Sequence, residues 1–194
     1  MALRPILLEG DARLRQKAKK ISRIDRSLLR LVDDMFETMR AAPGIGLAAP
    51  QVGVPLRVIV VEHEGHTFAL FNPEIVRSRG ETVVDDEGCL SIPQWFGPVA
   101  RVSDVTVKGQ DANGKKVRFK LDGLVARALM HEIDHLDGVL FTDRVEDRTK
   151  LRQVEPEDDP SEGRTAGPSE QQPGSPGQDD QDQSDEPPQP TAAS

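Results

Sequence analysis

His131-Glu132-Ile133-Asp134-His135 is the most informative stretch of this chain of 194 residues. It follows the pattern H-E-x-x-H, and residues four apart on an α-helix share one face, with Cβ atoms roughly 5–6 Å apart. The two imidazoles can therefore share one metal ion, and Glu132 can accept a proton from a metal-bound water. The stretch predicts metal-assisted hydrolysis, but a catalytic site of this kind usually has a third protein ligand.

The residues that follow the motif do not supply an obvious third ligand. The longer metalloprotease pattern H-E-x-x-H-x-x-G-x-x-H would place a histidine where Phe141 stands. Later carboxylates occur at Glu146 and from Glu155 onward, where the composition is typical of an unfolded chain. Upstream, Cys89 is the only cysteine, and a thiolate is a good ligand for zinc or ferrous iron. Alone, Cys89 would be interpreted as a small buried apolar residue; with a two-histidine helix in the chain, we interpret it as the third ligand.

A third unusual stretch, Gly-Ile-Gly-Leu-Ala-Ala-Pro-Gln-Val-Gly, occupies residues 44–53. Its small residues would let another backbone approach closely. Gln51 has a neutral amide that can donate a hydrogen bond to a carbonyl oxygen. Taken alone, the stretch is better interpreted as a Gly/Pro-rich turn between a helix and a strand.

Together the three stretches resemble the peptide deformylases, whose motifs are G-φ-G-φ-A-A-x-Q, E-G-C-φ-S and H-E-φ-D-H, where φ is apolar. Here the motifs occur in that order at residues 44–51, 87–91 and 131–135, and the resemblance covers about residues 3–147. It implies a metal-dependent hydrolase that removes the formyl group from the initiator methionine of newly made proteins. N-formylmethionyl nascent peptides are then the expected partners.

The residues themselves predict a Cys-His-His site with an open fourth position for water, and Glu132 as the general base. By resemblance, the oxyanion is stabilised by the side-chain amide of Gln51 and the backbone N–H of Leu90. One divalent ion per chain is expected. The family precedent is Fe(II) in the cell, with Zn(II), Ni(II) and Co(II) as alternatives that the sequence leaves open.

The resemblance also implies how the substrate peptide is held. The backbone of the small-residue stretch would pair with the extended peptide, Glu87 would orient nearby groups and the peptide's first amide, and the helix before His131 would line an apolar pocket for methionine. The residues expected to contact substrate are Gly44, Ile45, Gly46, Glu87, Leu124 and Ala128.

Three features allow more than one interpretation. Asp134 can accept the second N–H of a ligating histidine, or it can be a solvated or salt-bridged helix residue. Trp95, the only tryptophan, either borders the substrate groove or is a partly buried packing residue. His63 and His66 are interpreted as solvated residues around a tight turn at Gly65, rather than as a second metal site.

The charge of the chain is unevenly distributed. The formal net charge is −8, but residues 154–194 alone carry eleven acidic residues and one arginine, so residues 1–153 carry about +2. The C-terminal segment lacks Leu, Ile, Phe, Met and Trp and cannot bury enough apolar surface to fold, so it is expected to be disordered. We therefore predict a catalytic domain at residues 1–150 and a disordered acidic tail at 151–194.

The chain has no apolar N-terminal signal and no apolar stretch approaching 18 residues. A monomer in the reducing cytoplasm, without a membrane partner, is therefore expected, and this setting would protect a thiolate ligand. The acidic tail should repel RNA, so no direct nucleic-acid binding is predicted, and transient docking to the ribosome is left open.

The periodicity of apolar residues and the turn signals predict an α+β fold, with a central catalytic helix packed among antiparallel β-sheets. Asp25 and Asp122 are the expected N-caps of the two helices, and Gly138 ends the second. The predicted helices are 26–41 and 124–136, and the predicted strands are 56–61, 67–71, 99–108 and 115–121.

Two rival functions are weighed against deformylation. A related hydrolase could use the same site on another small acyl group. Alternatively, the three ligands could hold a structural ion in a binding or redox-sensing protein. A structural site usually has a fourth protein ligand, and this role would leave Glu132 without a purpose, so we rank it last.

Overall fold

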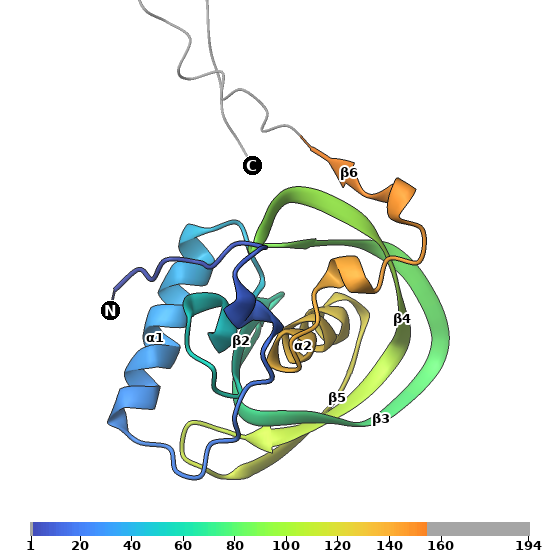
Figure 1. Cartoon of the computed structure of the whole chain (residues 1–194). Coiled ribbons are helices and arrows are strands. Elements are labelled where there is room, and N and C mark those ends of the chain that lie inside the picture. Colours follow the sequence, from blue (N-terminus) through green and yellow to red (C-terminus); the bar gives the residue numbers. More distant parts are fainter. Residues whose placement is uncertain (1, 155–194) are drawn as a thin grey trace, which may run out of the picture. The chain divides into compact units, whose positions relative to one another are not determined.

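The structure is a computed structural model that describes residues 2–154, and the acidic tail predicted from the sequence lies outside the described residues from residue 155 onward. Figure 1 shows its arrangement, with the helix α2 surrounded by curved strands. The helices and strands, in chain order, are α1 (Arg26–Ala41), β1 (Gly46–Ala48), β2 (Val58–His63), β3 (His66–Cys89), β4 (Ile92–Gln110), β5 (Lys116–Asp122), α2 (Gly123–Leu136) and β6 (Arg152–Gln153).

The described strands form one antiparallel sheet in the order β1-β2-β3-β4-β5, and β6 pairs with β4. β3 and β4 are long, and their pairing shifts register at four places. Such shifts increase the local twist and bend of a strand, and the sheet curls around α2 (Figure 1). The predicted α+β fold is confirmed, with one curved antiparallel sheet in place of several.

β2 lies between the two helices and explains why the core has two main parts. Ile59 and Val61 belong to the apolar cluster of α2, whereas Val58 and Val60 belong to the cluster of α1. All four side chains are buried, as expected for a strand covered on both faces. β2 and α2 are therefore in direct contact through apolar side chains, which fixes the helix that carries the H-E-x-x-H motif.

Both helices lie close to their predicted positions. The side chain of Asp25 accepts hydrogen bonds from the backbone N–H groups of Ser27 and Leu28, as expected for an N-cap. Asp122 occupies the N-cap position of α2, but its side chain makes no capping hydrogen bond, so this part of the expectation is wrong. Gly138 adopts a left-handed conformation with φ +75° just after α2, as a helix-ending glycine does.

The strands extend further than the sequence indicated. β3 was expected to end near Phe71 but continues to Cys89, and its second half is largely exposed. Taken alone, residues 44–53 are typical of a turn, but in the structure they contain the short strand β1 and a 3-10 helix (Ala49–Val52). Residues 151–154 continue the described fold past residue 150, because β6 pairs with β4.

Neither α1 nor α2, nor any shorter helix of the described part, combines the length and apolar character needed to cross a membrane.

Candidate active site

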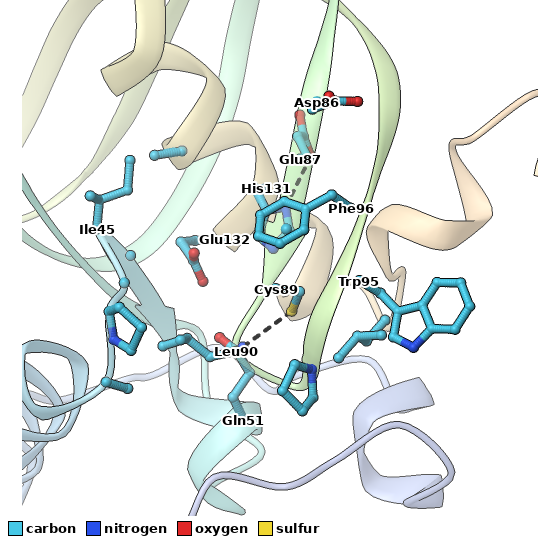
Figure 2. Close-up of a pocket in the computed structure, with 18 of the residues that line it drawn as sticks. Ile45, Gln51, Asp86, Glu87, Cys89, Leu90, Trp95, Phe96, His131 and Glu132 are labelled. Carbon is cyan, nitrogen blue, oxygen red and sulfur yellow. Dashed lines mark hydrogen bonds and ion pairs between the residues drawn. The ribbon is translucent and has the colours of Figure 1, made fainter. Parts of the chain in front are cut away.

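The three sequence motifs meet around one cavity of about 510 Å³. β1 supplies one wall, the end of β3 and the start of β4 supply another, and α2 supplies a third (Figure 2). Every residue that we expected at the site lies at this cavity except the deeper ligand His135. The lining includes Gly44, Ile45, Gly46, Gln51, Glu87, Cys89, Leu90, Leu124, Ala128, His131 and Glu132.

Cys89, His131 and His135 form a cluster that can hold a metal ion. Cys89 Sγ lies 3.2 Å from His135 Nε2, and one donor atom from each of the three residues lies within 4.8 Å of the other two. Metal–ligand bonds of about 2.0–2.3 Å at tetrahedral angles place ligand atoms roughly 3.5 Å apart, so the three donors can surround one divalent metal ion. In residues 2–154 no other group of three or more such side chains is found, and His63 and His66 belong to none.

The ring of His131 is oriented by Glu87. His131 Nδ1 lies 3.0 Å from Glu87 Oε2, and both side chains are buried. A carboxylate can only accept from this N–H, so the hydrogen bond leaves His131 Nε2 as the lone-pair donor for an ion. We expected Glu87 to orient nearby groups, and His131 is one of the groups that it contacts.

Two arginines complete the surroundings of Glu87. Arg101 donates to both carboxylate oxygens at 2.8 Å, and Arg127 donates to Oε1 at 2.9 Å. Burial alone would raise the pKa of Glu87, but the hydrogen bonds from Arg101 and His131 outweigh it and lower the pKa to about 2. Glu87 is therefore an anion whose oxygens are already engaged with protein groups.

Asp134 takes the salt-bridge role that the sequence left open. Arg101 Nη1 donates to Asp134 Oδ2 at 2.7 Å, and Arg144 also pairs with this carboxylate. Arg101 thus joins Asp134 on α2 to Glu87 on β3. The histidine support that was an alternative role for Asp134 is supplied to His131 by Glu87.

Sequence reasoning did not identify Arg101 and Arg127 as parts of the site. Arg127 lies on α2 one turn before His131, so it shares the face of the ligand. Arg127 is the only charged residue of α2 before His131, and its position on the same helix face as the ligand could have indicated a role at the site. Arg101 gave no local signal, because its contacts with Glu87 and Asp134 join separate elements.

Glu132 has the opposite surroundings. Its side chain is buried, and Oε2 has no hydrogen-bond partner among the described residues. Burial raises the pKa of Glu132 to about 7. A Cβ atom at Gly46 would collide with Glu132 Oε1, so only glycine leaves room for the carboxylate at this point. Within the described chain, the group closest to Gly46 is thus the Glu132 carboxylate.

Gln51 is held with its amino group toward the cluster. Its Oε1 accepts the backbone N–H of Ala48 at 2.8 Å, which turns Nε2 toward Cys89 Sγ at 3.6 Å and Ser91 Oγ at 3.2 Å. Figure 2 shows Gln51 and Leu90 on the same side of Cys89. Leu90 lies in the turn between β3 and β4, where its backbone faces no regular strand partner.

The substrate-contact residues expected from the resemblance lie on the cavity walls. Ala128 is buried, whereas Leu124 is 48% exposed, so Leu124 lies toward the opening of the cavity. Trp95 also lines the cavity and is 38% exposed, which favours its place at the groove. In Figure 2 its indole points away from Cys89, so it belongs to the outer rim.

Comparison with known proteins agrees with this geometry. Residues 3–151 match the family model described as polypeptide deformylase. The chain is 51% identical over 168 residues to a peptide deformylase of Thermomicrobium roseum, covering 82% of this chain and 95% of that protein. It is 53% identical over 146 residues to one from Heliobacterium modesticaldum, covering 75% and 96%.

Solved structures give the same result for the fold. A peptide deformylase of Synechococcus elongatus in complex with actinonin aligns with a TM-score of 0.74 and 47% identity, covering 77% of this chain and 84% of that one. The peptide deformylase of Thermotoga maritima aligns with a TM-score of 0.74 and 40% identity, covering 76% and 100%.

Proposed function

The chain belongs to the polypeptide deformylase family and removes the N-formyl group from new peptides, and we propose that Cys89, His131 and His135 hold the divalent ion required. The observation that carries this proposal is the position of Glu132. A buried carboxylate oxygen without a hydrogen-bond partner in the described residues lies beside a cluster of three metal-ligating side chains. A structural ion would not need such a group.

When bound, a divalent ion would polarise the formyl carbonyl and lower the pKa of a water molecule. The protein's own contribution is proton transfer and charge stabilisation. Glu132 accepts one proton of the attacking water and returns it to the leaving amine nitrogen as the C–N bond breaks, so that a neutral amine and formic acid result, and the formic acid then loses its proton to solvent as formate. The amide of Gln51 and the N–H of Leu90 donate to the oxygen that becomes negative.

The walls of the cavity suit a small acyl group on an extended peptide. β1 is the last strand of the sheet, so its outer edge is open to pair with a substrate backbone at Ile45 and Gly46. The methionine side chain enters the part of the cavity lined by Ala128 and, nearer the opening, Leu124. Because the carboxylate of Glu87 is engaged with arginines, its effect on the peptide would pass through His131 and through its own backbone.

The proposal extends to ferrous iron as the native ion and to a cytoplasmic monomer. Cys89 is only half-buried, and a thiolate ligand that solvent can reach is protected in a reducing compartment. We assign catalysis to residues 1–150, together with the β6 segment that continues the fold. Transient docking at the ribosome would supply nascent substrate, without direct nucleic-acid binding.

The test is an anaerobic formate-release assay on a formyl-Met-Ala peptide, with elemental analysis of the same sample. We expect one ion per chain and formate release that stops when a chelator removes the ion. Acetyl-Met-Ala is the matched control and should be hydrolysed far more slowly. Faster hydrolysis of the acetyl peptide would instead identify a hydrolase for another acyl group.

A further inference from the structure

Trp95 is a large apolar side chain that stays exposed at the opening of the cavity. It is 38% exposed and lines the cavity, as does Leu124, which is 48% exposed. Leu124 belongs to the part of the cavity assigned to the methionine side chain, whereas the proposed reaction gives Trp95 no role. Covering an indole ring with another apolar group removes a large apolar area from water. An exposed ring at the mouth of a binding cavity is therefore a candidate contact for the ligand.

The backbone around Trp95 is held in place by β6. Trp95 pairs with Gln153, and the carbonyl of Gln94 accepts a hydrogen bond from the backbone N–H of Val154 at 2.8 Å. The side chains of Gln153 and Gln94 are also in contact, at 3.4 Å. The indole is thus presented from a paired strand, so little ordering of the backbone is needed when a ligand covers it.

Phe96, the next residue, is already packed against other parts of the protein. A Cβ atom at Gly88 would lie 2.5 Å from the ring of Phe96, and the guanidinium of Arg152 lies 5.7 Å from its centroid. Because neighbouring side chains of a strand point to opposite faces, Trp95 is directed away from these contacts. Of the two aromatic residues at the rim, Trp95 is the one left available to a ligand.

The charged residues of the cavity wall near the rim are paired with other protein groups. Asp86 lines the cavity and forms an ion pair with Arg152 at 2.5 Å. Deeper in the cavity, Glu87 is neutralised by Arg101 and Arg127. A substrate side chain that reaches the indole therefore meets an apolar ring and no unpaired charge from these residues. This arrangement favours an apolar side chain over a charged one.

The direction of the bound peptide determines which side chain can reach Trp95. Figure 2 shows Ile45 and Trp95 on opposite sides of Cys89. In the proposed complex the peptide is extended along β1, and its methionine side chain points toward α2. Successive side chains of an extended chain point to opposite faces, so the side chain of the second residue points away from α2, toward the opening. Trp95 lies at this opening, so the second residue is the one that it can contact.

We propose that Trp95 is a specificity-determining residue, which makes the enzyme prefer formylated peptides with a large apolar or aromatic side chain directly after the methionine. The proposal rests on the proposed function, because it concerns the second residue of the same substrate. It assigns Trp95 a role in binding the peptide and none in the chemical step.

The contact is remote from the reacting bond, which determines how it appears in the kinetics. An interaction that is equally strong in the bound substrate and in the transition state lowers KM and leaves kcat unchanged. Contact between two aromatic rings at a partly exposed position should change kcat/KM by about fivefold. A merely structural role of Trp95 would instead change the kinetics of every peptide alike.

The test uses C-terminally amidated peptides that differ only in the order of two residues. Formyl-Met-Phe-Ser places the aromatic ring second and formyl-Met-Ser-Phe places it third, so the overall hydrophobicity is the same. Three full-length variants are compared with the unaltered protein: Trp95→Ala, the conservative Trp95→Phe, and Leu29→Ala. Leu29 is the matched control, because it is an exposed apolar residue on α1 that does not line the cavity.

In the unaltered, metal-loaded protein, the ratio of kcat/KM for formyl-Met-Phe-Ser to that for formyl-Met-Ser-Phe should be about five. Trp95→Ala should lower this ratio at least about threefold, through a higher KM for the first peptide, whereas Trp95→Phe should keep at least about half of it. Leu29→Ala should leave the ratio and both kcat values unchanged.

A second measurement does not depend on any substitution at Trp95. The chain contains one tryptophan and no tyrosine, so its fluorescence reports on Trp95. In the zinc-loaded Glu132→Gln protein, formyl-Met-Phe-Ser should shift the emission to shorter wavelength, because the substrate ring displaces water from the indole. Formyl-Met-Ser-Phe at saturation should produce a smaller shift.

An equal ratio in the unaltered protein and in Trp95→Ala would overturn the inference. A preference for formyl-Met-Ser-Phe that Trp95→Ala removes would overturn it as well, because Trp95 would then contact the third residue. If Trp95→Ala fails to fold, an emission spectrum that saturating formyl-Met-Phe-Ser leaves unchanged is still decisive against the inference. Absence of turnover of both peptides in the unaltered, metal-loaded protein would instead contradict the proposed function.

Discussion

Glu87 and Glu132 are both buried next to the same histidine cluster, yet their surroundings differ completely. Glu87 accepts hydrogen bonds from Arg101, Arg127 and His131, and its pKa is about 2. Glu132 faces the bare backbone of Gly46, keeps one oxygen without a partner in the described residues, and has a pKa raised by burial to about 7.

The two carboxylates therefore have different roles: Glu87 holds a metal-ligating histidine in place, and Glu132 takes part in proton transfer. A carboxylate that must hold a ligand in place gains from permanent charge and fixed partners. A carboxylate that must take up and return a proton needs a pKa near the working pH and an uncommitted oxygen. Two glutamates fill these two roles because their neighbours differ: arginines surround Glu87, and a glycine faces Glu132.

The largest expected effect comes from removing the reactive carboxylate. Glu132→Gln should lower kcat by about 10²–10⁴-fold, because the water loses its proton acceptor. The metal content and the melting temperature should stay near those of the unaltered protein, since no arginine is left unpaired. Steady-state kinetics with elemental analysis measures both, and full activity in this variant would exclude Glu132 as the base.

Disrupting the hydrogen-bond network around Glu87 should lower the free energy of unfolding. Arg101→Met removes two charge-assisted hydrogen bonds from buried Glu87, which keeps Arg127 and His131, and leaves Asp134 with only the more exposed Arg144, so the free energy of unfolding should fall by about 3–5 kcal/mol. Arg40→Met is the matched control, because Arg40 makes a similar two-bond pair with Glu62 on the surface, and it should cost about 1 kcal/mol or less. Equal costs in denaturant titrations would show that the buried network does not hold the site.

A substitution at Gly46 tests whether Glu132 needs the space that this glycine leaves beside its carboxylate. Gly46→Ala places a methyl group against the Glu132 carboxylate, and a displacement of about 1 Å in a catalytic group can cost about 10²-fold in turnover. Gly97→Ala is the control, because Gly97 does not line the cavity and its methyl group meets the movable end of the Leu151 side chain at 2.8 Å. A loss for Gly46→Ala no larger than for Gly97→Ala would contradict the close approach of Glu132.

The smallest effect is expected in the pH profile. Glu132 must be ionised to accept a proton, so kcat/KM should fall tenfold per pH unit below its pKa. Burial raises that pKa to about 7, and a neighbouring divalent ion would lower it, so the acid limb should have an apparent pKa of 7 or below. The residual activity of Glu132→Gln should lack this limb; its persistence would assign the limb to another group.

The sequence predicted the parts of this site that rely on local spacing. The i, i+4 histidines, the bounds of α1 and the capping role of Asp25 follow from helical periodicity and short-range hydrogen bonds, and the structure places them as expected. Cys89 could be joined to the histidines because ligand chemistry requires a third donor.

The rest depends on contacts between distant residues. Arg101 reaches Glu87 across 14 positions and Asp134 across 33, and no local pattern encodes such pairs. The second half of β3 is exposed along most of its length, so it lacks the alternation of apolar and polar residues that signals a strand. β6 is too short to be recognised before its pairing with β4 is known.

The central claim is that one sulfur and two imidazoles bind the catalytic ion, and X-ray absorption spectroscopy of the zinc-loaded protein tests it most directly. We predict one sulfur neighbour at about 2.3 Å and at least two nitrogen neighbours at about 2.0–2.1 Å, with the sulfur absent in Cys89→Ser. A spectrum of the unaltered protein that contains only nitrogen and oxygen neighbours would contradict the account.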